Sequence, residues 1–173
     1  MDQAMTHFMT EEMMRQYQQM VVEGKFTGRT TLLFADRIKN FCAAFGAETL
    51  LDYGCGRGDQ YDNHHLDKEW GVTVTGYDPG VLSYRKRPEG KFDGVICIDV
   101  LEHIEKKDLP AVLYDVCGFV NKFLFLTICT RPAKKSLPDG RNCHLTVKPR
   151  EWWLELLNKH VPPWVYYEVD WNV

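Results

Sequence analysis

Hydrophobic positions along the chain alternate between helical and strand-like spacing. Apolar residues spaced three and four apart predict helices that begin near Thr10, at Thr30 or Thr31, after Asp108 and at Pro149. Short apolar runs between them predict strands at about residues 49–53, 71–78, 92–99, 122–127 and 164–170, with one more short helix at 60–69. Strands that alternate with helices indicate an α/β fold, a mostly parallel sheet of about five strands with flanking helices.

Two helices precede the first strand. Thr10 is placed to cap a helix with Met13, Tyr17 and Met20 on one face, and Gly46 is placed to end the second helix. No linker, internal repeat or low-complexity tract interrupts the 173 residues. We therefore expect a single domain, in which residues 1–46 form a helical lid and residues 47–173 an α/β core.

A glycine-rich turn follows the first strand. The segment TLLDYGCGRG runs from Thr49 to Gly58 and places glycines at 54, 56 and 58 after Asp52 and Tyr53. Glycine is needed where the backbone turns sharply or lies directly against a ligand. Such a turn between a strand and a helix predicts a nucleotide-like ligand at the carboxyl edge of the sheet.

Acidic residues stand at the ends of three predicted strands: Asp52, Asp78 and Asp99. Asp78 lies 20 residues after Gly58, where a carboxylate can accept hydrogen bonds from both ribose hydroxyls. Asp59 occupies the third glycine position of a dinucleotide motif and would repel a pyrophosphate, and the chain has no GK[ST] phosphate loop. The pattern favours a nucleoside ligand without phosphate, and S-adenosylmethionine meets that description.

Three motifs in order, LDYGCGRG, GYDPG and FDGVICIDVLEHI, resemble the class I S-adenosylmethionine-dependent methyltransferases, in particular their small-molecule and ubiquinone-biosynthesis-like branch. The resemblance covers roughly Leu50 to Thr130. It implies a Rossmann-like fold, S-adenosylmethionine as cofactor, and transfer of a methyl group to a small-molecule or nucleotide-like acceptor by in-line displacement. The positions that it implies for cofactor binding are Asp52, Tyr53, Gly54, Gly56, Gly58, Tyr77, Asp78, Pro79, Asp99 and Val100.

The chain departs from the family pattern after Asp78. Only 13 residues separate Asp78 from Phe92, too few for the helix, strand and two loops that the family usually has there. We therefore predict that the usual third strand is missing. The adenine side of the site would then be more open, or closed by residues 79–91.

Candidate catalytic residues follow from the same resemblance and from their position: His144, His103 and Glu102. If the acceptor carries a proton, a general base contributes roughly 10²–10⁴ in rate. His103 could instead cap a helix or fill space after its strand, and both interpretations stay open. His144 lies between a basic loop and a tryptophan-rich helix, where it is a candidate substrate contact.

Two further groups of polar residues have simpler explanations. His64 and His65 lie near Asp62 and Asp67, but a short surface helix explains them, so no metal site is predicted. A basic loop after the fourth strand is either solvated or binds an anionic acceptor; it contains Arg131, Lys134, Lys135 and Arg141.

Composition limits the other functions. A net charge of −3 gives no global basic field that would attract nucleic acid. A nucleic-acid methyltransferase would therefore depend on local basic segments, Arg85–Arg87 and the 131–141 loop. The chain has no [ND]PP[YF] or Pro-Cys catalytic motif that would support such a function. A non-catalytic cofactor-binding subunit is the other alternative. The chain lacks a membrane-length apolar run and a signal-peptide pattern, and its six scattered cysteines are expected to be buried reduced thiols. A cytoplasmic protein is expected; the oligomeric state is not predicted.

Overall fold

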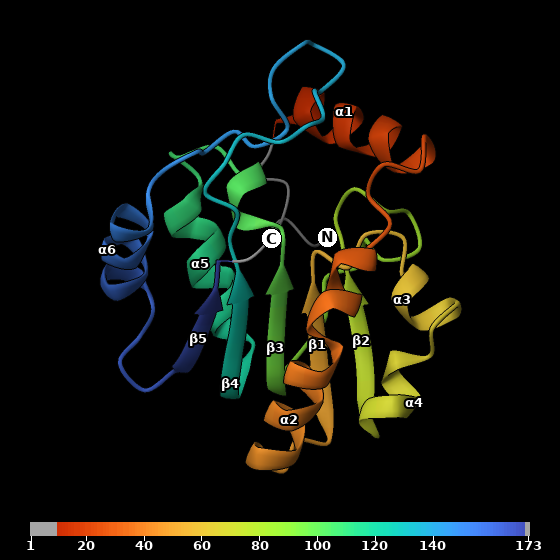
Figure 1. Ribbon diagram of the computed structural model, residues 1–173, viewed down its shortest axis with the longest axis vertical. Coiled ribbons are helices and arrows are strands. Elements are labelled where there is room, and N and C mark those ends of the chain that lie inside the picture. Colours follow the sequence, from red (N-terminus) through yellow and green to blue (C-terminus); the bar gives the residue numbers. More distant parts are fainter. Residues whose placement is uncertain (1–9, 172–173) are drawn as a thin grey trace.

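The computed structural model describes residues 10–171, and the fold is a five-stranded sheet flanked by helices (Figure 1). The neighbouring strands all run parallel, in the order β2-β1-β3-β4-β5. The strands are β1 (Thr49–Tyr53), β2 (Thr73–Tyr77), β3 (Phe92–Ile98), β4 (Val120–Thr127) and β5 (Tyr166–Asp170). This confirms the predicted Rossmann-like α/β class.

The strand order reverses between β1 and β3. The chain passes from β1 outward to β2, then returns to the other side of β1 to form β3, β4 and β5. In open parallel sheets, ligands bind at the carboxyl ends of the strands beside such a reversal. Topology alone therefore places a binding crevice at the ends of β1 and β3, where the glycine turn and Asp99 lie.

The predicted absence of a strand between β2 and β3 is confirmed. Residues 78–91, all of which the structure describes, form neither helix nor strand. This loop is held in place: Tyr84 donates its backbone N–H to Val81, and the Arg87 guanidinium forms an ion pair with Asp115 at 2.7 Å and lies 4.6 Å from the Phe119 ring centre.

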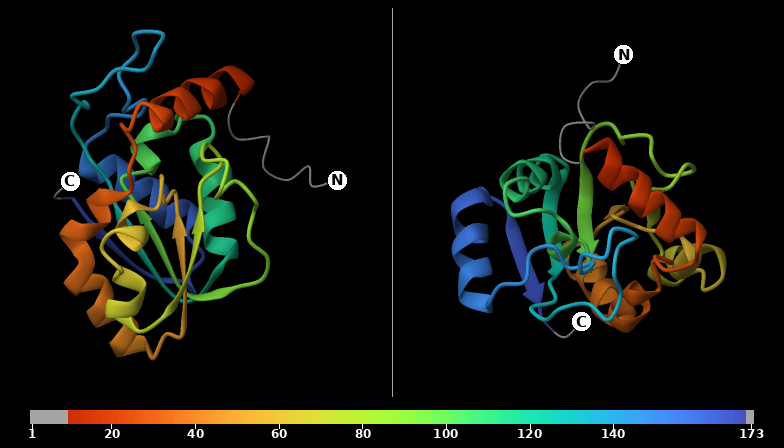
Figure 2. Two further views of the ribbon diagram at one scale, coloured as in Figure 1. Left: turned by 90° about the vertical axis from the view of Figure 1, so that its right-hand side faces the viewer. Right: turned by 90° about the horizontal axis from the view of Figure 1, so that it is seen from above.

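Helices cover both faces of the sheet (Figure 2). Because alternate residues of a strand point to opposite faces, Leu50, Ile96 and Phe123 pack on one side and Leu51, Val95 and Leu124 on the other. The first side is covered by α2 (Ala35–Phe45) and α4 (Leu66–Trp70), with α3 (Asp59–Asp62) beside them; the second is covered by α5 (Leu109–Gly118) and α6 (Arg150–His160).

Some predicted helix boundaries differ from the structure. The helix expected at 60–69 is two short helices, α3 and α4, because His65 has a φ of 53° and breaks the run. The second N-terminal helix begins as a 3-10 turn, η1 (Arg29–Phe34), before α2. The cap at Thr10 is confirmed, since its hydroxyl accepts the Met13 N–H at 3.2 Å.

Helix α1 (Glu11–Val22) lies across the carboxyl ends of the strands (Figure 1). Its buried Met13 and Met20 pack with Leu137 and Cys143 from the loop after β4. Helix α2 instead packs on the sheet face, so only the segment before it is positioned as a lid over the edge. The apolar face of α2 thus belongs to the core.

All six cysteines are free and buried, as predicted. Within residues 10–171, none of the helices is both long and apolar enough to span a bilayer. The expectation about a signal peptide concerns residues that include 1–9, which lie outside the described part of the chain.

Candidate functional site

A cavity of about 700 Å³ opens at the carboxyl ends of β1, β2 and β3. Its walls come from the glycine turn, the ends of β2 and β3, the lid formed by α1 and residues 25–31, and the loop after β4 with Cys143 and His144; His103, Ile104 and Val112 complete them. Small-molecule sites typically have volumes of about 300–1,000 Å³. This cavity is therefore large enough for a nucleoside-sized ligand together with a small second molecule.

Two glycines of the turn form one wall, and neither has room for a side chain. Gly54 has a φ of 87°, and a Cβ there would lie 2.3 Å from Val100 Cγ2. Gly56 has a φ of 58°, and its Cβ would lie 2.8 Å from the backbone nitrogen of Gly28. L-residues rarely adopt this backbone conformation. The turn thus presents bare backbone to the cavity, as predicted for a ligand cradle.

Asp52 does not line the cavity, although the resemblance implied a cofactor contact. Its buried carboxylate accepts hydrogen bonds from Gln60 Nε2 at 2.9 Å and from the Tyr61 hydroxyl at 2.7 Å. Burial raises the pKa of Asp52 to about 6, an effect that the Tyr61 and Gln60 hydrogen bonds oppose. Asp52 fixes the turn to the helix that follows it.

Gly58 and Tyr77 are also absent from the cavity wall. The position that a Gly58 Cβ would occupy is filled by the Tyr84 hydroxyl, 2.3 Å away. Tyr77 is buried with its ring edge-on to Tyr53, 5.2 Å between ring centres, and Tyr53 itself does line the cavity. Gly58 and Tyr77 therefore shape the site from behind its surface.

Asp78 follows β2 and faces the cavity. One carboxylate oxygen accepts the Gly56 N–H and the other the Gly80 N–H, each at 2.9 Å. Burial raises the pKa of this carboxyl, and the two backbone N–H groups oppose that rise. A carboxylate oxygen has two lone pairs, so both oxygens remain able to accept a ligand hydroxyl. Pro79 and Gly80 continue the wall.

Asp99 directly follows β3 and has an unusual backbone conformation. Its φ is 59°, a conformation that costs a residue with a side chain about 1–3 kcal/mol and is concentrated at functional sites. The residue is held there by its N–H, which donates to Thr127 Oγ1 at 2.9 Å, and by Thr30, whose hydroxyl donates to its carboxylate at 3.3 Å. Asp99 and Val100 both line the cavity.

His103 ends the 3-10 turn η2 (Leu101–His103) and lines the cavity although it is 9% exposed. Its Nδ1 lies 2.9 Å from the Cys143 carbonyl oxygen, and its Nε2 lies 4.0 Å from an Asp99 carboxylate oxygen. Burial lowers the pKa of His103 to about 4 against the opposing effect of Asp99. The ring is therefore neutral near pH 7, with Nδ1 protonated and a lone pair on Nε2. It does not serve merely as a helix cap.

His144 comes from a loop 41 positions further along the chain and meets His103 edge to face, with ring centres 4.8 Å apart. Its Nδ1 lies 2.6 Å from the Arg131 carbonyl oxygen, which can only accept a hydrogen bond. Nδ1 therefore carries the proton in this ring too. The fold brings together the two histidines that the sequence singled out separately.

Glu102 lies beneath the cavity wall and does not face the acceptor side as implied. One carboxylate oxygen accepts the Cys129 N–H, and the backbone carbonyl accepts the Thr146 N–H at 3.0 Å. Burial, followed by the charge of Asp99, raises the pKa of Glu102 to about 8. The implied catalytic role is not supported by this placement, because the carboxylate has no access to a molecule in the cavity.

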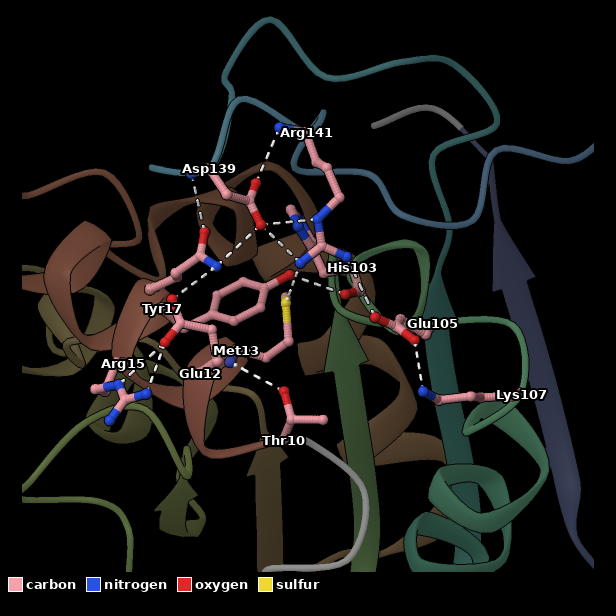
Figure 3. Close-up of polar contacts among 11 residues, drawn as sticks. Thr10, Glu12, Met13, Arg15, Tyr17, His103, Glu105, Lys107, Asp139 and Arg141 are labelled. Carbon is pink, nitrogen blue, oxygen red and sulfur yellow. Dashed lines mark hydrogen bonds and ion pairs between the residues drawn. The ribbon is translucent and has the colours of Figure 1, made fainter.

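The lid is tied to the opposite wall (Figure 3). The Tyr17 hydroxyl donates to the His103 carbonyl oxygen at 2.8 Å, and Gln16 Nε2 donates to Asp139 at 2.9 Å. Arg141 joins Asp139 to Glu105, with nitrogen–oxygen distances of 2.8 and 3.3 Å. Arg141 thus belongs to the lid attachment, whereas the other three basic-loop residues line the cavity: Arg131, Lys134 and Lys135.

Sequence reasoning missed several residues that complete the site. Thr27 accepts the Asp59 N–H at 3.2 Å, and Gly28 lies so close to the glycine turn that a Cβ would be 2.3 Å from the Cys55 carbonyl oxygen. Thr30 holds Asp99. The signal available in the sequence was the loop EGKFTGRT, whose two glycines predict a turn without indicating which surface it would cover.

Comparison with known proteins agrees with this architecture. The sequence model of a family described as the methyltransferase domain matches residues 5–171. Among solved structures, magnesium protoporphyrin IX methyltransferase from Synechocystis PCC 6803, with bound SAH, has a TM-score of 0.51 and 19% identity over 77% of this chain and 73% of its own.

An O-methyltransferase family protein from Burkholderia thailandensis has a TM-score of 0.49 and 15% identity over 78% of this chain and 51% of its own. A comparison with curated protein sequences gives no match. The family match covers almost the whole chain, and the fold and glycine turn agree with it. The chain therefore belongs to the methyltransferase domain family, has the class I fold of that family and shares its cofactor, S-adenosylmethionine.

Proposed function

We propose that this protein is an active methyltransferase that transfers a methyl group from S-adenosylmethionine to a small-molecule or nucleotide-like acceptor. One observation carries the proposal. The bare glycine wall, the Asp78 carboxylate and the His103–His144 pair line a single cavity at the strand reversal. A module that only bound the cofactor would not need two ordered imidazoles on the wall beyond it.

The residues present fit the cofactor. Gly54 and Gly56 leave the wall open for the amino-acid part, because a Cβ at either position would collide with its neighbours. Asp78 offers both carboxylate oxygens to a ribose, and Pro79 lies beside it for the adenine. Asp99 and Val100 border the region between this half and the histidines. Asp52, Gly58 and Tyr77 act as supports of these contacts.

The bound cofactor supplies a methyl group already activated by its sulfonium. What remains for the chain is to align an acceptor in line with the methyl group and to exclude water, and orientation of this kind contributes ~7–11 kcal/mol of barrier lowering. Tyr17, Phe26 and the backbone of residues 27–28 close over the cavity for this purpose. If the acceptor carries a proton, that proton is removed beside His103 and His144. Either an imidazole nitrogen acts as the base, or the two rings hold a cation that assists the loss of the proton.

The acceptor is expected to be small and to carry negative charge. A cavity of about 700 Å³ must hold the cofactor as well, which leaves limited volume for the acceptor. Arg131, Lys134 and Lys135 line the same cavity and supply positive charge to it. The six free thiols fit the reducing cytoplasm that the sequence predicts.

The test combines binding and turnover. Calorimetry with S-adenosylmethionine measures cofactor binding, and incubation with methyl-labelled cofactor and fractionated metabolite and nucleic-acid extracts identifies the molecule that gains the label. His144→Ala should leave cofactor affinity unchanged and reduce turnover, since the ring lies on the acceptor side. Binding without any labelled product in either extract would instead support a non-catalytic cofactor-binding subunit, and label in nucleic acid would support the nucleic-acid alternative.

A further inference from the structure

Three potential metal ligands converge on one wall of the cavity. Asp99, His103 and His144 each offer a ligand atom, and these atoms all lie within 4.8 Å of one another. Metal–nitrogen and metal–oxygen bonds of about 2.0–2.2 Å place the ligands of one ion ~3–3.5 Å apart. The most widely separated of these atoms would have to approach each other by about 1.3–1.8 Å to bind one ion.

Both imidazoles are oriented as metal ligands usually are. His103 directs Nδ1 to the Cys143 carbonyl oxygen at 2.9 Å, and His144 directs Nδ1 to the Arg131 carbonyl oxygen at 2.6 Å. A backbone carbonyl that accepts the Nδ1 proton fixes the tautomer and leaves Nε2 as the free donor atom. The two rings meet edge to face with their centres 4.8 Å apart, so both histidines lie within reach of one ion.

Two acidic groups, Asp99 and Glu102, lie beside the histidines. Within residues 10–171, Asp99 and Glu102 form no ion pair with a lysine or arginine; Thr30 donates to Asp99, and the Cys129 N–H donates to Glu102. The second Glu102 oxygen is fully buried without a hydrogen-bond partner among the described residues, and Asp99 is its acidic neighbour.

Lys135 of the basic loop contacts the lid and forms no ion pair with Asp99 among residues 10–171. The Lys135 ammonium donates to the Lys25 carbonyl oxygen and lies 5.5 Å from the Phe26 ring centre. Lys135 thus forms its contacts with the lid while it lines the same cavity as His103.

We propose that Asp99, His103 and His144 bind a divalent transition-metal ion on the acceptor side of the cavity, with Glu102 supporting Asp99 from below. Two nitrogen donors and one carboxylate suit Zn²⁺, Co²⁺, Mn²⁺ or Fe²⁺ better than the all-oxygen preference of Mg²⁺ or Ca²⁺. All three ligands line the cavity, so the remaining coordination positions face its interior. The sequence predicted no metal site because the third ligand is far away in the chain.

The ion defines the acceptor chemistry, a step that rests on the proposed methyl transfer. An acceptor hydroxyl bound to the ion loses its proton to solvent more readily, because the metal lowers the pKa of bound oxygen. The oxygen lone pair then forms the new bond to the methyl carbon, and the electron pair of the broken carbon–sulfur bond stays on sulfur. The acceptor is therefore an alcohol, phenol or similar hydroxyl compound, and the two histidines act as ligands in place of a general base.

Metal binding is measured without cofactor or acceptor, on full-length protein freed of any affinity tag and treated with chelator. Titration with Co²⁺ is followed by visible absorption, and titration with Zn²⁺ by calorimetry. We expect one ion per chain. Asp99→Asn and His144→Ala should each weaken binding at least about tenfold, since even changes in the residues that support metal ligands cost about 10–100-fold. The exposed His64 provides a matched control, and His64→Ala should leave the affinity unchanged.

Several outcomes separate the possibilities. Absence of a Co²⁺ absorption band and of Zn²⁺ heat at millimolar concentrations would overturn the site, as would equal affinity in His144→Ala and wild type. Circular dichroism melts show whether each variant folds. If His144→Ala does not fold, the test rests on Asp99→Asn, in which the new side chain has nearly the same shape as the original one. Metal binding with no affinity for S-adenosylmethionine would retain the site and refute the proposed function, whereas methyl transfer unaffected by chelator would refute the metal's role in the reaction.

Discussion

Replacing Gly54 by alanine tests whether the glycine wall is required for packing and for ligand access. The added Cβ would lie 2.3 Å from Cγ2 of Val100, 3.2 Å from Cγ1 and 3.4 Å from Cβ. Rotation about χ1 of Val100 offers no relief, because the Cβ and both methyl groups are close and β-branched side chains have few rotamers. Val100 must move, and with it the cavity wall.

The magnitude follows from two separate costs. A non-glycine residue at a φ of 87° costs about 1–3 kcal/mol, and forcing an extra methyl into a packed contact costs about 1–3 kcal/mol more. Gly46→Ala separates the two, since Gly46 also has a positive φ, 55°, but a Cβ there would meet nothing within 4 Å. We therefore expect Gly54→Ala to be about 1–3 kcal/mol less stable than Gly46→Ala.

Urea unfolding followed by circular dichroism measures the free energy of unfolding of both variants and of wild type, and equal slopes validate the comparison. Calorimetry with S-adenosylmethionine adds a second readout. Gly54→Ala should weaken binding because it displaces Val100 on the cavity wall, whereas Gly46 lies far from the cavity at the end of α2 and should have no effect. Equal destabilisation by the two substitutions, or unchanged cofactor affinity in Gly54→Ala, would refute the proposed close packing of the wall.

Three other substitutions test the site. Asp78→Ala should abolish S-adenosylmethionine binding in calorimetry, because it removes the ribose acceptor and the partner of the Gly56 N–H; unchanged affinity would refute the ribose assignment. Asp52→Asn should flatten the pH dependence of stability measured by urea unfolding. Because the pKa of Asp52 is raised from 3.8 to about 6 in the folded protein, the protonated carboxyl stabilises the fold fully below pH 3.8, and this contribution is lost as pH rises through 6. Tyr17→Phe should weaken cofactor binding about fivefold, since loss of one hydrogen bond to His103 costs about 1 kcal/mol and loosens the lid.

Matched controls accompany these three variants. Asp62→Ala removes an exposed carboxylate near the turn and should leave cofactor affinity unchanged. A slope of stability against pH that is the same in Asp52→Asn as in wild type between pH 4 and 7 would contradict the role of burial in raising the pKa of Asp52. Unchanged affinity in Tyr17→Phe would mean that the lid does not depend on this contact.

Much of the fold could be predicted from the sequence because its signals are local. The apolar run of β3, the cap at Thr10 and the glycines after β1 each reflect the preferences of a few neighbouring residues. The absence of the strand that the family usually has there followed from length, since residues 79–91 are too few for it and the helix and loops that accompany it. The break between α3 and α4 was missed because it depends on a left-handed His65 that no residue pattern signals.

The candidate site likewise has features that the sequence predicts and features that depend on the tertiary structure. The sequence determined the glycine turn, the acid after β2 and the histidine after β3, because backbone conformation and the parallel sheet bring strand ends to one edge. Only the tertiary structure decided which of these groups face the cavity: Asp78 does, whereas Asp52 and Glu102 are turned into the protein. It also decided that His144 meets His103 and Asp99, because this contact depends on how the loop after β4 packs against α1, and side chains far apart in sequence carry no mutual spacing that a pattern could reveal.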